Sequence, residues 1–375
     1  MHRSAIIAAL VATATAWPTQ SQRNVNLFKV ELAPGEVREV TEAEKFALID
    51  EGIGFIDVTD WPQSSTTLAN RRTVTYPTEL TNAKSVQDLI QQLDKSRIKT
   101  NLETFTTFNN RYYQAETGNQ SAEWLLAQVR SYIPPNSPAT VSIFPHTYRQ
   151  SSIVATIPGK SSRTVVVGAH QDSINGAAGV DRMTARAPGA DDNGSGSMAI
   201  LEAFRTLLND TTIGSGDASQ TIEFHWYAAE EVGLLGSGAI FRSYAESGRD
   251  IVAMLNQDMT GNTAGYVSQN MTPKFGVVTD RTDIPLTDFA RRIIKAYTNT
   301  EGADTACNYG CSDHDSATKA GYPSAFIFEG EMHGPNDNPY VHTADDTTEK
   351  IDFDHVLEHT KLVVGFVVEL ALAIL

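Results

Sequence analysis

Val165-Val166-Val167-Gly168-Ala169-His170 joins a short apolar run to a polar side chain, and this stretch carries the main signal for the fold. Similar apolar runs occupy residues 222–229, 251–255 and 325–328, and none of them alternates strictly between apolar and polar residues. Such runs are typical of strands buried on both faces of a sheet. A stripe with helical spacing lies between the first two runs: Met198, Leu201, Phe204 and Leu208. The strand–helix–strand order predicts an α/β fold, a three-layer sandwich around a mixed, largely parallel central sheet.

The composition is that of an ordinary globular protein. The chain has 375 residues, of which 41% are hydrophobic and 20% charged, which is enough for one large core. Its net charge of −16 would repel phosphates, so we expect no nucleic-acid partner. We interpret the excess of acidic residues as a property of a soluble surface that indicates no particular binding partner.

The N-terminal region predicts export and then processing. A positive start at residues 1–3, an apolar run over 4–11 and Ala14-Thr15-Ala16 predict a signal peptide over residues 1–16 and a secreted, extracellular protein. Residues 17–75 differ in character from the remainder of the chain, and near their end lies the dibasic pair Arg71-Arg72. We interpret them as a propeptide that could inhibit the mature protein or help it fold, with the mature domain over 76–375. The alternative for the dibasic pair is two ordinary surface arginines.

The C-terminal stretch 362–375 is also apolar, but it is too short to span a membrane and contains Glu369. It continues a helical pattern that starts at Phe353. We therefore expect a buried terminal helix and no membrane partner, rather than a lipid-anchor signal.

Potential metal ligands lie where these elements end or where loops begin. They are His170, Asp191, Glu231, Asp258 and His342. In open α/β sheets, sites form at the carboxyl ends of strands. Three carboxylates and two imidazoles are more ligands than a single tetrahedral zinc ion can take. They can bind two zinc ions if one carboxylate bridges the pair. The sequence therefore predicts two zinc ions per subunit and a metal-dependent hydrolase.

The neighbours of these ligands have chemical roles of their own. Asp172 is two residues after His170 and can orient that imidazole, as metal-bound histidines require. Glu230 and Glu231 are adjacent in an extended segment, so their side chains point in opposite directions. One of them can therefore bind metal while the other faces a metal-bound water.

The chain resembles the secreted co-catalytic di-zinc aminopeptidases, and most closely the fungal leucine aminopeptidases. The resemblance is carried by the runs GAHQDS at 168–173, PGADDNGSG at 188–196, AEEVGLLGS at 229–237, NQDM at 256–259 and HTADDT at 342–347. It extends from about residue 76 to the end. It implies a zinc-dependent exopeptidase fold and a monomer that releases N-terminal, preferably leucine-like, residues from peptides with a free N-terminus.

The resemblance also implies a role for each site residue. Asp191 would bridge the two ions, with a cis peptide bond to Asp192. His170 and Asp258 would complete one zinc site, and Glu231 and His342 would complete the other. Glu230 would act as the general base and then as the general acid.

The two cysteines, Cys307 and Cys311, are four residues apart, and in a secreted protein this spacing predicts a local disulfide. Between them, Tyr309 matches a family tyrosine that donates a hydrogen bond to the oxyanion. Without the family it is an aromatic side chain in a loop. The resemblance places four residues in or near the pocket for the first side chain of the substrate: Met259, Phe326, Phe328 and Met332. Ordinary core packing is the alternative for each of them.

Sequons at Asn119, Asn209 and Asn270 permit glycosylation. Three other functions remain open at this point. A metal-dependent carboxypeptidase or deacylase would need a further domain inserted in the chain. A single-zinc glutaminyl cyclase shares the fold and many of the motifs. A non-catalytic binding module would be expected to have lost ligands or the base, whereas all six positions carry suitable residues here.

Overall fold

The computed structural model describes residues 26–61 and 73–375, which form two sheets of different size. The predicted signal peptide and the Arg71-Arg72 pair lie outside the described residues. The boundary between propeptide and catalytic domain stays a prediction. Val74 and Tyr76 already belong to the large core, and the Tyr76 hydroxyl donates to the Val252 carbonyl at 2.8 Å.

The N-terminal segment 26–61 forms a small three-stranded antiparallel sheet. Its strands are β1 (Leu27–Ala33), β2 (Glu36–Thr41) and β3 (Ile56–Asp57), in the order β2-β1-β3. Helix α1 (Glu42–Asp50) follows β2 directly. It begins at Thr41, whose side chain accepts the Glu44 backbone N–H while Glu44 bonds back to the Thr41 N–H. This reciprocal capping satisfies two backbone donors at the helix start.

The catalytic part is built on an eight-stranded mixed sheet in the order β10-β9-β11-β8-β6-β7-β5-β4. The strands are β4 (Thr140–Phe144), β5 (Ser152–Ile157), β6 (Thr164–His170), β7 (Thr221–Tyr227), β8 (Ile251–Asn256), β9 (Lys274–Val278), β10 (Glu301–Thr305) and β11 (Ser324–Phe328). The four central strands β11, β8, β6 and β7 run parallel, and these are the four apolar runs of the sequence. Antiparallel pairs occur on both sides of this centre. The predicted mixed sheet is therefore confirmed.

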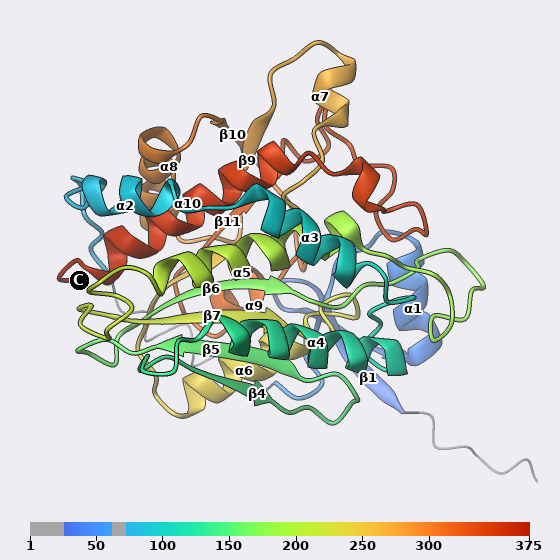
Figure 1. The fold of residues 1–375 in the computed structure, drawn as a ribbon. Coiled ribbons are helices and arrows are strands. Elements are labelled where there is room, and N and C mark those ends of the chain that lie inside the picture. The colour runs from blue at the N-terminus through green and yellow to red at the C-terminus, as the bar shows by residue number, and fades with distance from the viewer. Residues whose placement is uncertain (1–25, 62–72) are drawn as a thin grey trace, which may run out of the picture.

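Helices cover both faces of this sheet (Figure 1). One face carries α2 (Ala83–Ile90), α3 (Lys95–Phe105), α4 (Glu116–Tyr132), α5 (Gly196–Leu207), α8 (Ile284–Tyr297) and α10 (Phe353–Ala371). The other face carries α6 (Leu235–Glu246) and α9 (His314–Lys319). Shorter elements are the turn η2 (Ala190–Ser195), α7 (Ala264–Ser268) and η3 (Thr348–Lys350). The three-layer architecture is as predicted.

The apolar C-terminus forms the buried helix α10, as predicted. Its N-cap Asp352 accepts the backbone N–H groups of Asp354 and His355. The helix packs between α5, α8 and α2 on the sheet. Among the described residues, no helix has the length and apolar character needed to span a bilayer.

The parallel centre of the sheet positions the site. Strands β6, β7 and β8 lie side by side and run in the same direction, so their carboxyl ends meet at one edge. His170 is the last residue of β6, while Glu230 and Asp258 follow β7 and β8 within three residues. The predicted ligand loops are thereby brought together.

Candidate metal centre and active site

The buried His170, the half-buried His342 and three carboxylates converge at this edge of the sheet. His170 Nε2 lies 3.1 Å from Asp192 Oδ1 and 3.3 Å from Asp258 Oδ1. His342 Nε2 lies 3.0 Å from Asp192 Oδ2 and 2.8 Å from Glu231 Oε2. Each group of three offers ligand atoms within 4.8 Å of one another. The two groups share Asp192, which directs one oxygen to each histidine.

The prediction that Asp191 is the shared carboxylate is wrong by one residue. The Asp191 side chain accepts the Gly261 backbone N–H at 2.9 Å and the Asn338 amide at 2.8 Å, so it belongs to the supporting network. The cis peptide bond also lies one residue further on, between Asp192 and Asn193. The side chains of the two adjacent aspartates in η2 point in different directions. The sequence motif does not show which of them faces the histidines.

Asp172 connects the histidine at the end of β6 with the two adjacent glutamates. Its Oδ1 lies 3.5 Å from His170 Nδ1, on the side of the ring opposite the ligand atom. The same carboxylate accepts the backbone N–H groups of Glu230 at 3.0 Å and Glu231 at 3.2 Å. One side chain therefore orients an imidazole and fixes the turn after β7, the kind of support that metal ligands require.

The electrostatics of the site favour bound cations. Burial raises the pKa of Glu231 to about 7 and that of Glu230 well above its usual value. Burial alone would also raise the pKa of Asp192, but hydrogen bonds from His170 and His342 outweigh it and lower that pKa. Glu231 Oε1 is buried and has no hydrogen-bond partner among the described residues. Crowded buried carboxylates are costly unless positive charge neutralises them, and two divalent ions would do so. The donor set fits zinc.

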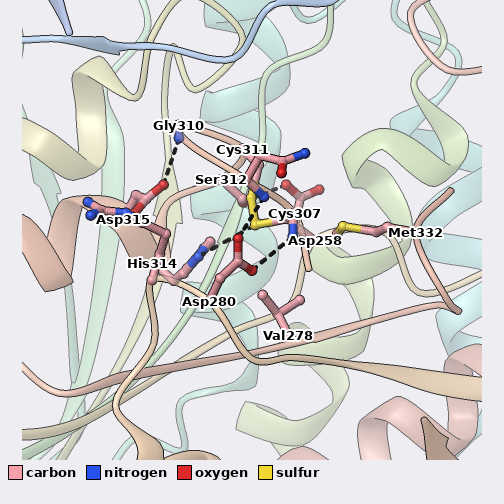
Figure 2. The surroundings of a disulfide bond; sticks show 12 residues. Asp258, Val278, Asp280, Cys307, Gly310, Cys311, Ser312, His314, Asp315 and Met332 are labelled. Atoms are coloured by element: carbon pink, nitrogen blue, oxygen red, sulfur yellow. Dashed lines mark hydrogen bonds and ion pairs between the residues drawn. A yellow bond between two sulfur atoms is a disulfide. The ribbon is translucent and has the colours of Figure 1, made fainter. Parts of the chain in front are cut away.

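The predicted disulfide between Cys307 and Cys311 is formed and shapes the loop that carries Tyr309. Figure 2 shows the carboxylates of Asp280 and Asp315, which accept hydrogen bonds from the backbone of this loop. Asp280 accepts the Cys307 backbone N–H at 2.9 Å, and Asp315 accepts that of Gly310 at 2.8 Å. These contacts fix the backbone on both sides of the tyrosine.

The same loop reaches the metal centre through Ser312. Its hydroxyl donates to Asp258 Oδ2 at 2.5 Å and accepts the Asn256 amide at 2.7 Å (Figure 2). Asp258 Oδ1 is thereby left facing His170. Ser312 directly follows the second cysteine, so the disulfide loop and the metal ligand are mechanically linked.

A cavity of about 340 Å³ adjoins these groups and contains all four predicted pocket residues. Its wall includes Met259, Phe326, Phe328 and Met332 together with Glu230, Tyr309 and the disulfide. Phe326, Phe328 and Met332 pack together beside the disulfide. The cavity can therefore take an apolar side chain next to the metal centre.

The N-terminal segment 26–61 forms part of the wall of this cavity. Residues of the turn between α1 and β3, including Ile53 and Phe55, line it together with the ligands. The backbones are in direct contact, because a Cβ added to Gly54 would lie 2.3 Å from the Tyr309 carbonyl oxygen. A Cβ on Gly310 would lie 2.5 Å from the backbone of Phe55. Only glycine permits this approach at both positions.

A model described as "Peptidase family M28" matches residues 152–367, more than half of the chain. The chain belongs to peptidase family M28. It is 47% identical to a probable leucine aminopeptidase of Arthroderma otae, over 97% of this chain and 98% of that protein. It is 50% identical to leucine aminopeptidase 1 of Colletotrichum graminicola, over 92% of this chain and 85% of that protein. The solved aminopeptidase LapA of Legionella pneumophila is similar with a TM-score of 0.76 and 26% identity, over 95% and 96% of the two chains.

These relatives confirm the resemblance to the fungal leucine aminopeptidases. This member of family M28 is a metallo-aminopeptidase, a hydrolase that acts on peptide bonds. The family and the donor set together imply zinc. The carboxypeptidase, the glutaminyl cyclase and the non-catalytic module are disfavoured.

Sequence reasoning missed several supporting residues of the M28 site. Asp346 accepts the backbone N–H groups of Asp191 at 2.9 Å and Asp192 at 3.0 Å, which holds the turn η2. Its position four residues after His342, within one motif, was the available signal. Burial raises the pKa of Asp346 to about 8. Asp313 is fully buried near the site without a recognisable signal in the sequence.

The three sequon asparagines differ in exposure. Asn209 and Asn270 are exposed, and Asn119 is half-buried in α4. Glycosylation at these positions stays a prediction.

Proposed function

We propose that this protein is a secreted two-zinc aminopeptidase that releases N-terminal, preferably hydrophobic, residues from peptides and is made as an inactive proenzyme. The observation that carries the proposal is the shared carboxylate. Asp192 directs one oxygen to the group of His170 and Asp258 and the other to the group of Glu231 and His342. A bridging carboxylate with one imidazole and one further carboxylate on each side is a suitable cage for two neighbouring zinc ions.

When bound, the zinc ions would lower the pKa of a water molecule and polarise the carbonyl of the peptide bond. Glu230 is the remaining carboxylate of the cavity wall that neither histidine engages. Burial raises its pKa well above the usual value, which suits a group that must both accept and return a proton. Glu230 takes the proton from the water and passes it to the leaving amine.

The cavity supports recognition of an N-terminal residue. Glu230 and Asp258 line it, so a free α-amino group would enter beside the metal centre, whose ions can bind an amine nitrogen. The apolar cluster of Phe326, Phe328 and Met332 in its wall would accommodate a leucine-like or aromatic side chain. A substrate with an acylated amino group lacks a nitrogen that could bind in this way.

The N-terminal segment 26–61 would act as an inhibitor before it is removed. Its turn around Gly54 occupies part of the cavity wall, and its helix packs Phe46 and Ile49 against Tyr112, Tyr113 and Val232 of the catalytic part. A peptide that entered the site would have to displace these contacts. Cleavage in residues 62–72 would leave Val74 and Tyr76 in the large core and release the segment.

The segment would also withdraw Tyr309 from catalysis. Burial raises the pKa of Tyr309, and its hydroxyl is hydrogen-bonded to Glu31 of β1. Glu31 forms an ion pair with Lys319 of α9 as well. In the processed enzyme the hydroxyl is free to donate to the oxyanion that forms at the peptide carbonyl.

The base assignment is tested with the processed, zinc-loaded enzyme. We expect Glu230→Ala to lower turnover of a leucine anilide by roughly 10²–10⁴-fold. Metal analysis should still find two zinc ions per chain. Glu301→Ala, which removes an exposed glutamate, is the control. Loss of zinc from Glu230→Ala would mean that the two adjacent glutamates have the opposite roles, and fewer than two ions in the wild type would contradict the two-zinc proposal.

The substrate class is tested by comparing leucine, arginine and glutamate anilides with an N-acetylated leucine anilide. Hydrolysis should be fastest for leucine and absent for the acetylated compound. Cleavage of the acetylated compound would contradict recognition of the free amino group.

The role of the segment is tested by comparing the uncut chain with a chain cut within residues 62–72. If the segment is an inhibitor, cutting the chain and removing the segment should increase activity. If cutting changes nothing, while a chain expressed from residue 73 fails to fold, the segment is a folding aid instead.

Secretion, and action as a monomer, are further parts of the proposal. The disulfide fits an oxidising compartment, and all ligands of the site come from one chain. N-terminal sequencing of protein collected outside the cell and its mass in solution test both. Digestion with a glycosidase tests the three sequons.

A further inference from the structure

One buried arginine joins the two backbone segments that carry metal ligands. Arg111 lies between α3 and α4 and is fully buried. Its Nε donates to the carbonyl of Gln171, the residue directly after β6, at 2.7 Å. Its Nη1 donates to the carbonyl of Pro188, and its Nη2 to that of Gly189 at 2.8 Å, at the start of η2. The guanidinium therefore connects the end of the strand that carries His170 with the turn that carries Asp192.

The backbone of the same residue closes this junction a second time. The Arg111 N–H donates to Ser173 Oγ at 3.0 Å, and this hydroxyl donates to the Ala187 carbonyl at 2.8 Å. Both ends of the long connection between β6 and η2 are therefore fastened at one point. A displacement of either end would change the separation of the two ligand loops.

The guanidinium is closely packed, and its hydrogen-bond partners require an arginine. Gly189 has φ +53°, and a Cβ there would lie 2.7 Å from Arg111 Nη2. On its other side the guanidinium lies 4.3 Å from the centre of the Phe105 ring. Three carbonyl groups need donors fixed in one plane, which a guanidinium supplies and an ammonium does not.

Arg111 also places a positive charge near the buried carboxylates of the site, among them Asp172, Asp192 and Asp346. Within residues 26–61 and 73–375 no carboxylate forms an ion pair with it. Burial lowers its pKa to about 10, while Asp346, Asp172 and Asp192 act in the opposite direction. The group therefore stays charged at neutral pH, close to several carboxylates that would otherwise repel one another.

We propose that Arg111 is a positioning residue of the metal centre, and that its guanidinium fixes the segments bearing His170 and Asp192 at the separation that two zinc ions require. This inference rests on the proposed two-zinc function. Arg111 contacts neither the ligand side chains nor the cavity. It acts through the backbone of the residues beside them.

The experiment compares Arg111→Lys and Arg111→Ala in the processed enzyme. Arg111→Lys retains the charge without the planar set of donors, and Arg111→Ala loses both. Zinc affinity is measured by competition with a chelator, and the absorption spectrum of the cobalt-substituted enzyme reports the geometry at the metals. Supporting residues of metal ligands typically contribute 10- to 100-fold in affinity, so we expect roughly that loss at both sites. We also expect a lower kcat with KM changed less than the metal affinity.

Arg186→Met is the matched control. Arg186 also donates to backbone carbonyl groups, those of Thr106, Phe108 and Asn109, but it is exposed and none of these groups adjoins a metal ligand. Its loss should leave zinc affinity and the cobalt spectrum unchanged. Guanidinium added to Arg111→Ala should restore part of the zinc affinity, whereas ammonium should not.

The inference is overturned if folded Arg111 variants bind zinc like the wild type, or if they lose no more affinity than Arg186→Met. If the Arg111 variants do not fold, Ser173→Ala decides, because it loosens the same junction and leaves the arginine in place. A severalfold loss of zinc affinity in Ser173→Ala supports the inference, and an unchanged affinity then contradicts it. A wild type that binds fewer than two zinc ions would contradict the proposed function itself, which is a separate result.

Discussion

The N-terminal segment 26–61 and the catalytic part 73–375 are held together by different means. The segment has a small apolar core around Val30, Val40 and Phe55, and its connections to the rest include the ion pair of Glu31 with Lys319 and that of Asp50 with Arg182. The catalytic part is built on one extensive core between the sheet and six helices. The segment also makes apolar contacts with the rest, but these belong to small separate clusters. A region with a small core of its own can be released as a unit, whereas a continuous core keeps distant ligands in place.

This difference predicts opposite signs for substitutions in the two regions. A change in the catalytic part that affects ligands should lower activity. A change that weakens the segment should raise the activity of the uncut chain. Substitutions at four positions, two in each region, test this contrast.

The largest effect is expected at Asp192. In the processed enzyme, Asp192→Asn should abolish measurable anilide hydrolysis and release at least one zinc ion, because both ligand groups share this carboxylate. Asp191→Asn is the matched control at the adjacent position and should keep both ions. Zinc content per chain is the measurement, and the reverse pattern would restore Asp191 as the bridging residue.

The next largest effect concerns the buried ion pair within the segment. Lys45 Nζ lies 2.5 Å from Asp57 Oδ2, and both side chains are almost completely buried. Removing one partner leaves an unpaired buried charge, so Lys45→Met should destabilise the segment by about 3–5 kcal/mol. Hydrogen exchange of the uncut chain should show faster exchange in residues 26–61 and no change in the large core. Lys84→Met removes an exposed pair and serves as the control.

A smaller effect is expected at the contact between the segment and Tyr309. Glu31→Gln in the uncut chain weakens a charged hydrogen bond and an ion pair, so residual activity should rise by roughly tenfold, equivalent to about 1.4 kcal/mol. Glu36→Gln, which changes an exposed glutamate of the same sheet, should have no effect. An unchanged rate of anilide hydrolysis in Glu31→Gln would show that the segment does not restrain Tyr309.

The smallest effect is a pH dependence confined to the catalytic part. Burial alone would raise the pKa of Glu223, but His225 and Arg249 outweigh it and lower that pKa to about 2 from 4.5. A lowered folded-state pKa stabilises the protein above the unfolded value of 4.5, and this contribution is lost as the pH falls toward 2. Glu223→Gln should therefore lower the melting temperature by a few degrees at pH 7 and by less at pH 3. An equal loss at both pH values would contradict the assignment.

Much of the architecture could be predicted because it depends on local patterns. The four central strands are continuous apolar runs, and α5 and α10 show helical spacing. The edge strands β4 and β10 are short and largely exposed, so they carry little apolar signal and were not predicted. The antiparallel strand pairs at the edges depend on the direction in which the chain re-enters the sheet. No local sequence pattern predicts that direction.

The site was predictable to the level of residue types but not of side-chain directions. Histidine and carboxylate residues at the ends of parallel strands must meet, because the sheet brings those ends together. Whether Asp191 or Asp192 faces the histidines depends on contacts from Asp346 and Gly261, which are far away in the sequence. Arg111 gave no signal at all, because its partners are backbone carbonyl groups that every residue possesses.

The central strands, the kinds of ligand at their ends and the cysteine pair that shapes the Tyr309 loop can all be inferred from the order of residues alone. These features depend on spacing over a few residues, which the periodicity of strands and helices translates directly into position. Three others emerge only in three dimensions: which aspartate is shared, how Arg111 joins the two ligand loops, and the part of the cavity wall that residues 26–61 form. Those outcomes depend on packing between segments that are distant in the chain, where a direction or a contact is set by every neighbour at once.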